Sequence, residues 1–111
     1  MGTVYYAFYN YCEHCEKVDK LCIGKLSVGF KPALRAHYKK NFSITSWCEW
    51  KKFLNKPGVV IKDEYGTTIS KDEFIERVEN WQESYEDYCY SFWDDCFIDK
   101  DGYEFIELEV L

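Results

Sequence analysis

Two cysteines separated by two residues are the part of this sequence best suited to chemistry. Cys12 and Cys15 lie between two apolar stretches, and Cys22 follows seven positions after the second of them. Two thiolates on a tight turn can bind one ion, and a third on the returning strand would supply another corner of a tetrahedron. Zinc is the ion that we expect, because it favours soft thiolate ligands in four-coordinate sites. Such an ion would contribute on the order of 10 kcal/mol to folding.

The fourth zinc ligand is not fixed by the spacing. Cys96 is preferred, because it begins a predicted terminal hairpin that we expect to lie against the first one. His14 stands between the paired cysteines and would point away from an ion that they share, and a lone thiol in a helix, such as Cys48, usually fills core space. The other candidates are His37 and Cys89. The predicted zinc ligands are Cys12, Cys15, Cys22 and Cys96.

Other uses of these thiols stay open. Free or buried cysteines are the simplest alternative. A thioredoxin-like redox pair is another, although such a pair usually opens a helix and none is predicted after Cys15. Cys89 and Cys96 repeat the spacing of Cys15 and Cys22, which allows a second ion. The chain starts without a basic stretch followed by an apolar segment, so we expect no signal peptide and a reducing compartment.

Few residues suit catalysis. A catalytic zinc needs an open coordination position and a general base, and the sequence has neither a His-Glu-x-x-His motif nor a deaminase signature. The chain holds only two histidines. The run Asp99 to Gly102 fails as an EF-hand calcium loop, because position twelve of that loop would be Leu108. We therefore predict a protein that is not an enzyme.

The elements that must position these residues are two strands and two helices. Residues 4–11 and 21–30 favour strands and predict a hairpin with the cysteine turn at its end. Ser46 and Ser70 each precede a glutamate by three positions, which is the capping-box pattern. They predict one helix over residues 47–54, and a second that opens after Ser70 and ends between Asn80 and Cys89. Shorter strands or turns are expected at 31–42, 59–61 and 64–69.

The carboxyl end predicts a second hairpin. Asp101-Gly102 favours a tight turn between strands at 96–98 and 103–110. Aromatic residues make up 20% of the chain, so we expect a core built largely from rings. No apolar run approaches the length of a membrane span. The expected fold is one α+β domain over residues 1–111: a small, mainly antiparallel sheet, two helices and a zinc knuckle in the N-terminal hairpin.

Acidic residues concentrate near the carboxyl end. The net charge is −6, and residues 82–111 hold one lysine against ten Asp and Glu residues. Segment 85–95 interleaves carboxylates with tyrosine and tryptophan rings, which dominate protein interfaces. Such a surface attracts a basic protein and repels nucleic acid, although a solvated face that keeps the protein soluble is the alternative. The predicted partner-binding residues are Glu86, Asp87, Trp93, Asp94 and Asp95.

Several short motifs resemble those of small bacteriophage proteins, over the chain up to about residue 80. In those proteins position 22 is a histidine, so Cys22 would exchange one zinc ligand for another, and position 26 is commonly serine where this chain has Leu26. The shared motifs are Met1-Gly2-Thr3 with Tyr5-Tyr6, Cys12-x-x-Cys15, Ile23-Gly24-Lys25-x-Ser27-x-Gly29-Phe30, Ile44-Thr45-Ser46-Trp47 and Asp63-Glu64-Tyr65-Gly66.

The chain is also similar to a zinc-containing anti-CRISPR protein of type II systems. That resemblance implies a phage-encoded inhibitor that acts in the cytoplasm of the infected bacterium. Its partner would be an RNA-guided DNA endonuclease, whose positively charged channel holds the guide and target strands. An acidic aromatic surface could block nucleic-acid loading there. A zinc-dependent enzyme, a redox protein and a small-molecule-binding phage protein are the alternative functions.

Overall fold

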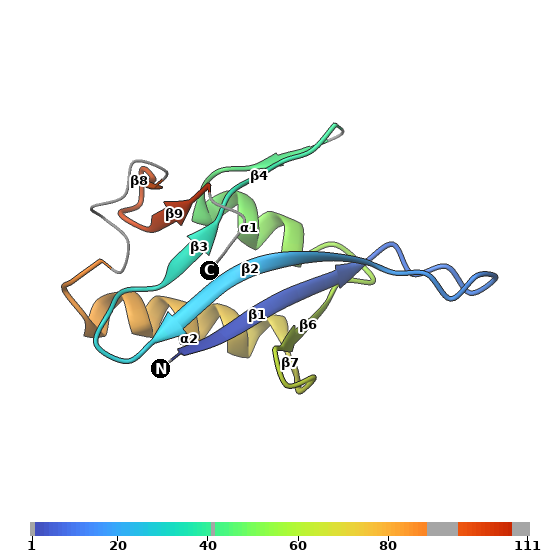
Figure 1. Cartoon of the computed structure of the whole chain (residues 1–111), viewed down its shortest axis with the longest axis horizontal. Helices are drawn as coiled ribbons and strands as arrows, with labels where there is room; N and C mark the ends of the chain where they lie inside the picture. The colour runs from blue at the N-terminus through green and yellow to red at the C-terminus, as the bar shows by residue number, and fades with distance from the viewer. Residues whose placement is uncertain (1, 41, 89–95, 108–111) are drawn as a thin grey trace.

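A seven-stranded sheet with two helices on one face makes up the protein (Figure 1). The computed structural model describes residues 2–40, 42–88 and 96–107, and the numbers of elements refer to these residues. The strand order is β7-β6-β1-β2-β3-β9-β8, with β4 and β5 as a separate ribbon. The elements are β1 (Gly2–Tyr9), β2 (Asp19–Ser27), β3 (Ala33–Arg35), β4 (His37–Tyr38), β5 (Ser43–Ile44), α1 (Trp47–Leu54), β6 (Val60–Asp63), β7 (Thr68–Ile69), α2 (Lys71–Ser84), β8 (Cys96–Ile98) and β9 (Glu104–Ile106).

The sheet is mainly antiparallel. The pairs β1–β2, β1–β6, β2–β3, β6–β7 and β8–β9 are antiparallel, and β3–β9 is parallel. The predicted α+β fold with two helices is confirmed. In the part of the chain that the structure describes, neither helix has the length and apolar character needed to cross a bilayer.

The first hairpin joins β1 to β2, from Gly2 opposite Ser27 to Tyr9 opposite Asp19. The register shifts after Tyr5, where Ile23 is the extra residue of a bulge. A bulge increases the local twist of a strand pair. The far end of this hairpin extends beyond the body of the molecule (Figure 1).

Serine caps begin both helices, as the sequence predicts. Ser46 Oγ accepts a hydrogen bond from the N–H of Glu49, and Ser70 Oγ accepts one from Glu73, each at 3.2 Å. The Glu49 carboxylate turns back to Thr45, whose N–H and hydroxyl donate to it at 2.9 and 2.8 Å. These donors lower the pKa of Glu49. Each helix therefore begins with a backbone N–H of its first turn bonded to the capping serine.

Aromatic rings fill the space between the sheet and the helices. On β1, Tyr5 and Tyr9 face the helices: Tyr5 lies 5.1 Å from the Phe74 ring of α2, and Tyr9 lies 5.2 Å from the Phe53 ring of α1. Trp50 is fully buried and donates from Nε1 to the carbonyl of Arg35 at 2.9 Å. Contacts from one strand to both helices show that they cover the same face of the sheet.

The terminal hairpin also follows its turn signal. Asp99 Oδ1 accepts hydrogen bonds from the N–H groups of Asp101 and Tyr103, at 2.9 and 2.8 Å. The second arm is β9, which ends at Ile106, whereas the predicted strand runs from residue 103 to residue 110. Residues 108–110 of that predicted strand lie outside the described residues. Pairing of β9 with β3 places this hairpin at the edge of the sheet, beyond β3.

Candidate metal centre and acidic surface

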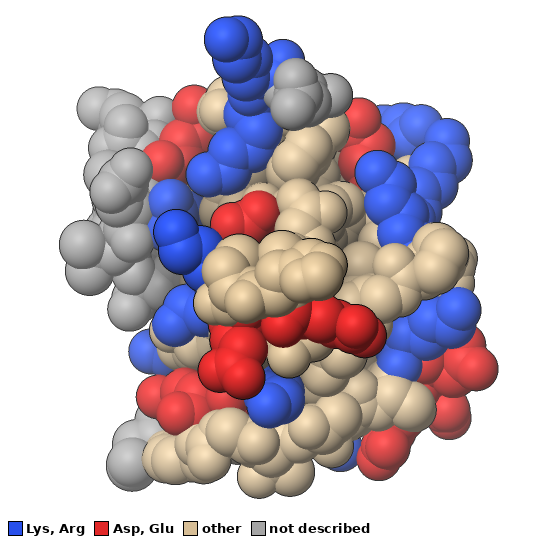
Figure 2. Space-filling view, turned by 90° about the vertical axis from the view of Figure 1, so that its right-hand side faces the viewer, with Lys and Arg blue, Asp and Glu red and all other residues tan. Residues whose placement is uncertain are grey.

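The Cys12–Cys15 pair lies on the turn at the far end of the first hairpin, as predicted. We call residues 12–17 the thiol turn. The N–H of Cys12 donates to the carbonyl of Lys17 at 2.9 Å and closes the turn. Behind it, Asn10 Nδ2 donates to Asp19 Oδ2 at 3.2 Å. Figure 2 looks onto this end of the molecule, where a band of acidic side chains crosses the centre and Lys and Arg groups surround it.

The surroundings of Cys12 favour the ionised form of its thiol. Hydrogen bonds from the N–H and the thiol of Cys15, and from the N–H of His14, lower the pKa of the Cys12 thiol. Glu16, directly after the pair, has a φ of 56°, a left-handed conformation that costs a residue with a Cβ roughly 1–2 kcal/mol. The backbone holds this conformation while its donors favour a thiolate, which is the form that binds metal.

Cys22 lies away from the thiol turn. It faces Tyr6 across the β1–β2 pair, three residues along β2 from Asp19, which is about 10 Å of strand. Burial raises the pKa of the Cys22 thiol to about 11. This thiol is therefore protonated at neutral pH.

Cys96 lies near the other end of the sheet. It is on β8, which is separated from β2 by β3 and β9. The distance from β2 to β8 across the sheet is therefore three strand spacings, or roughly 14 Å in total. Among the described residues, no group of three or more His, Cys, Asp and Glu side chains is close enough to hold a metal ion. The four predicted zinc ligands are thus not brought together, and zinc binding by Cys12 and Cys15 stays a prediction.

The remaining candidate ligands have separate positions. His37 Nε2 lies 2.7 Å from the Cys22 carbonyl, and its ring packs edge-on against Trp50 at 5.7 Å. Burial lowers the pKa of His37, which favours the neutral ring. His14 is exposed on the thiol turn, and Cys48 is partly buried on α1. Cys89 lies outside the described residues.

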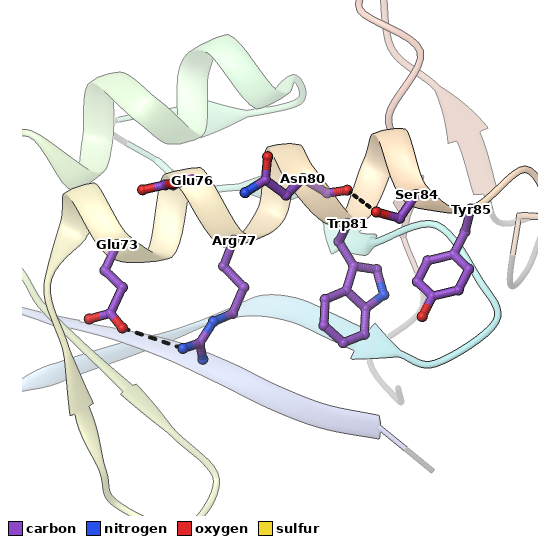
Figure 3. Close-up of a pocket in the computed structure, with 7 residues that line it drawn as sticks. All are labelled: Glu73, Glu76, Arg77, Asn80, Trp81, Ser84 and Tyr85. Atoms are coloured by element: carbon purple, nitrogen blue, oxygen red, sulfur yellow. Dashed lines mark hydrogen bonds and ion pairs between the residues drawn. The ribbon is translucent and has the colours of Figure 1, made fainter.

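A groove of about 530 Å³ runs along α2, from which Arg77 and Trp81 project toward β1 and β2 (Figure 3). Its wall includes Trp81, whose Nε1 donates to the Ser27 carbonyl at 3.0 Å, and Tyr85, whose ring lies 5.8 Å from the indole. Arg77 is engaged by Tyr5 Oη at 2.9 Å and Glu73 at 3.5 Å. Further groove residues are Glu76, Asn80 and Ser84.

The predicted partner-binding residues are only partly described. Glu86 and Asp87 are exposed just after α2, and the Asp87 carbonyl accepts from the N–H of Lys31 at 2.8 Å. Trp93, Asp94 and Asp95 lie outside the described residues. The sequence analysis did not single out the acidic residues of α2 itself, although the composition of residues 71–84 shows them. The carboxylates of α2 are Asp72, Glu73, Glu76, Glu79 and Glu83.

Two features thus stand out: the thiol turn at the hairpin end and the acidic groove along α2. The first offers two adjacent thiol ligands, and the second offers rings among carboxylates. The thiol turn is suited to binding a metal ion, and the groove along α2 is suited to binding a protein. Comparison with known proteins adds no relative, because no family model, no curated protein and no solved structure matches this chain.

Proposed function

We propose that this protein is a non-enzymatic anti-CRISPR inhibitor that binds an RNA-guided DNA endonuclease of a type II system and blocks its loading with nucleic acid. The contact would be the acidic α2 surface, which we define as the α2 groove together with Glu83, Glu86 and Asp87. The single observation that supports this proposal is that Trp81 and Tyr85 line the same groove as Glu73 and Glu76 (Figure 3). A zinc ion on the thiol turn would stabilise the first hairpin.

The charge of the surface suits a basic partner. Helix α2 carries five carboxylates against Lys71 and Arg77, a balance of −3, and Glu86 and Asp87 bring it to −5. Arg77 is already engaged by Glu73 and Tyr5. Channels that hold a guide–target duplex are positively charged, so this surface would be attracted to the same residues that bind nucleic acid.

The rings of the surface are held in place before binding. The Ser27 carbonyl fixes the Trp81 indole, and Tyr85 packs against that indole. A ring that is already ordered loses little conformational entropy on binding, and buried Trp and Tyr side chains are frequent hot spots of protein interfaces. The carboxylates would then set the orientation and the rings would supply contact area.

The test uses the guide-loaded nuclease and a labelled target duplex. Addition of the full chain should reduce target binding, measured by fluorescence anisotropy. The double variant Glu76→Lys/Glu86→Lys should weaken inhibition by about tenfold or more, which corresponds to ~1.4 kcal/mol. The matched control Asp101→Lys/Glu107→Lys changes the net charge equally on exposed carboxylates outside both α2 and the thiol turn, and should inhibit like the wild type.

Two outcomes would reject the proposal. The first is the absence of any inhibition by the wild-type chain at micromolar concentration. The second is an equal loss in the control variant, because total charge and not the acidic α2 surface would then determine binding. Circular dichroism of each variant should show the wild-type fold.

A further inference from the structure

The thiol turn provides half of a tetrahedral metal site. We propose that it binds zinc together with the thiol turn of a second copy of this chain, so that Cys12 and Cys15 of each copy hold one ion between them. The inference uses the zinc binding of the proposed function but is independent of the nuclease partner. The ligand is a divalent zinc ion, and its binding releases four thiol protons to solvent.

The ligand count points to a second chain. Structural zinc takes four protein ligands, and the thiol turn offers two. Cys22 is about 10 Å of strand away from the hairpin end and Cys96 is on β8, beyond two intervening strands. Among the described residues no third His, Cys, Asp or Glu joins the pair. A two-fold axis through the ion would bring the same two thiolates from a second copy and complete a four-sulfur site.

The turn is built to hold a metal-binding conformation. The N–H of Cys12 donates to the Lys17 carbonyl at 2.9 Å and closes the turn. The left-handed Glu16 makes the chain reverse directly after Cys15. Because these contacts are intrinsic to the hairpin, the two thiols are positioned before the ion arrives, and little ordering is needed on binding.

The position of the turn allows two copies to meet. The hairpin projects from one end of a molecule 45 Å long and 22 Å thick, away from both helices (Figure 1). Cys15 is exposed, and so are His14 and Glu16 beside it. Two hairpin ends can therefore approach one ion without contact between the helices of the two copies.

Exposed apolar side chains next to the turn fit the same arrangement. Tyr11 and Val18 flank the thiol turn, one on each side of it in the chain, and are 62% and 43% exposed. Together with Phe8 and Val60 they border a shallow hollow of about 340 Å³. Apolar groups clustered in this way mark contact surfaces, and a second hairpin would cover them. The turn also carries both charge signs, with Glu13 and Glu16 near Lys17, so two copies would not simply repel each other.

The experiment measures mass and zinc content together. Full-length protein is stripped with a chelator, kept in a non-thiol reductant and titrated with zinc chloride. Light scattering after size exclusion should show the mass rise from 13.3 kDa to twice that value. Saturation should occur at one zinc ion per two chains. Cobalt in place of zinc should give the absorption bands of a tetrahedral four-thiolate site.

Variants separate this site from the alternatives. Cys12→Ser and Cys15→Ser should each abolish zinc-dependent dimerisation, whereas Cys22→Ser and Cys96→Ser should dimerise like the wild type. One zinc ion per monomeric chain would overturn the inference, and so would a dimer that persists in chelator and reductant, or no zinc uptake at all. Nuclease inhibition by the Cys15→Ser variant reports separately on the proposed function, because the acidic α2 surface is unchanged.

Discussion

The indole nitrogen of Trp47 donates a hydrogen bond to the carboxylate of Glu79, 3.1 Å away, and so joins α1 to α2. The same carboxylate oxygen lies 3.3 Å from Lys51 Nζ. The Trp47 side chain is 1% exposed and stacks on the Tyr103 ring at 5.5 Å. One side chain thus ties the two helices to each other and to the terminal hairpin.

Removal of this indole N–H should destabilise the protein. Trp47→Phe keeps most of the ring but loses the donor, and we expect a decrease of about 1–2 kcal/mol in the free energy of unfolding, measured with urea. Glu79→Gln retains an acceptor oxygen and loses only a half-exposed ion pair, so it should cost less than about 1 kcal/mol. A larger effect of Glu79→Gln than of Trp47→Phe would contradict this account.

Gly24 is required by the close approach of β2 and β3. A Cβ at this position would lie 2.9 Å from the Leu34 Cα and still closer to the Ala33 carbonyl oxygen. Since both obstacles are backbone, Gly24→Ala should cost about 3 kcal/mol. Gly66→Ala is the matched control, because its φ is 85° but its Cβ would meet open space, and it should cost only roughly 1 kcal/mol. Equal losses in the free energy of unfolding for Gly24→Ala and Gly66→Ala, measured with urea, would contradict the close approach of β2 and β3 as the reason for Gly24.

The cysteines should differ in their rates of alkylation. N–H and S–H donors lower the pKa of Cys12, and burial raises the pKa of Cys22 from 9.0 to about 11. Cys22 therefore holds roughly a hundredfold less thiolate at neutral pH than an ordinary cysteine. In zinc-free folded protein, mass spectrometry should find iodoacetamide on Cys12 long before Cys22, and the difference should vanish in urea. Similar alkylation rates of Cys12 and Cys22 in the folded protein would contradict the opposite pKa shifts of the two thiols.

The stability of the protein should fall at alkaline pH through Tyr103. Burial, with the nearby carboxylates of Glu79 and Asp99, raises the pKa of this phenol from 10.0 to about 12. The folded state therefore keeps a proton that the unfolded chain loses. The contribution is fully present below pH 10.0 and is lost as the pH rises toward about 12. The free energy of unfolding, measured with urea, should decrease more steeply over this pH range for the wild type than for Tyr103→Phe. Parallel decreases in the two proteins would argue against a raised pKa of Tyr103.

Local signals in the sequence account for the elements that were predicted correctly. Ser46 and Ser70 mark the starts of both helices because a serine oxygen can accept from an N–H of the first turn. Asp101-Gly102 likewise predicts the terminal turn, where Gly102 has a φ of 88°, and the Asp99 carboxylate also accepts from the backbone inside it. Each signal depends on residues a few positions apart, so it is visible in sequence.

Long-range pairing was not visible in sequence. Nothing near Ala33 indicates that it pairs in parallel with Glu104, and this pairing places Cys96 far along the sheet from Cys12. The predicted link between the two hairpins depended on that arrangement. The bulge at Ile23 was likewise hidden, because it arises from the register of two strands. The cysteine pair was identifiable because its two members are on one turn, whereas the other predicted ligands depended on tertiary structure.

Zinc content is the most direct test of the thiol turn as a metal site. Protein purified without chelator from zinc-supplemented cells, in parallel with Cys15→Ser, should be measured by elemental analysis. We expect zinc in the wild type at about half an equivalent per chain, and a loss of nearly all of it in the variant. Metal-free wild-type protein, or equal zinc in both, would contradict the account.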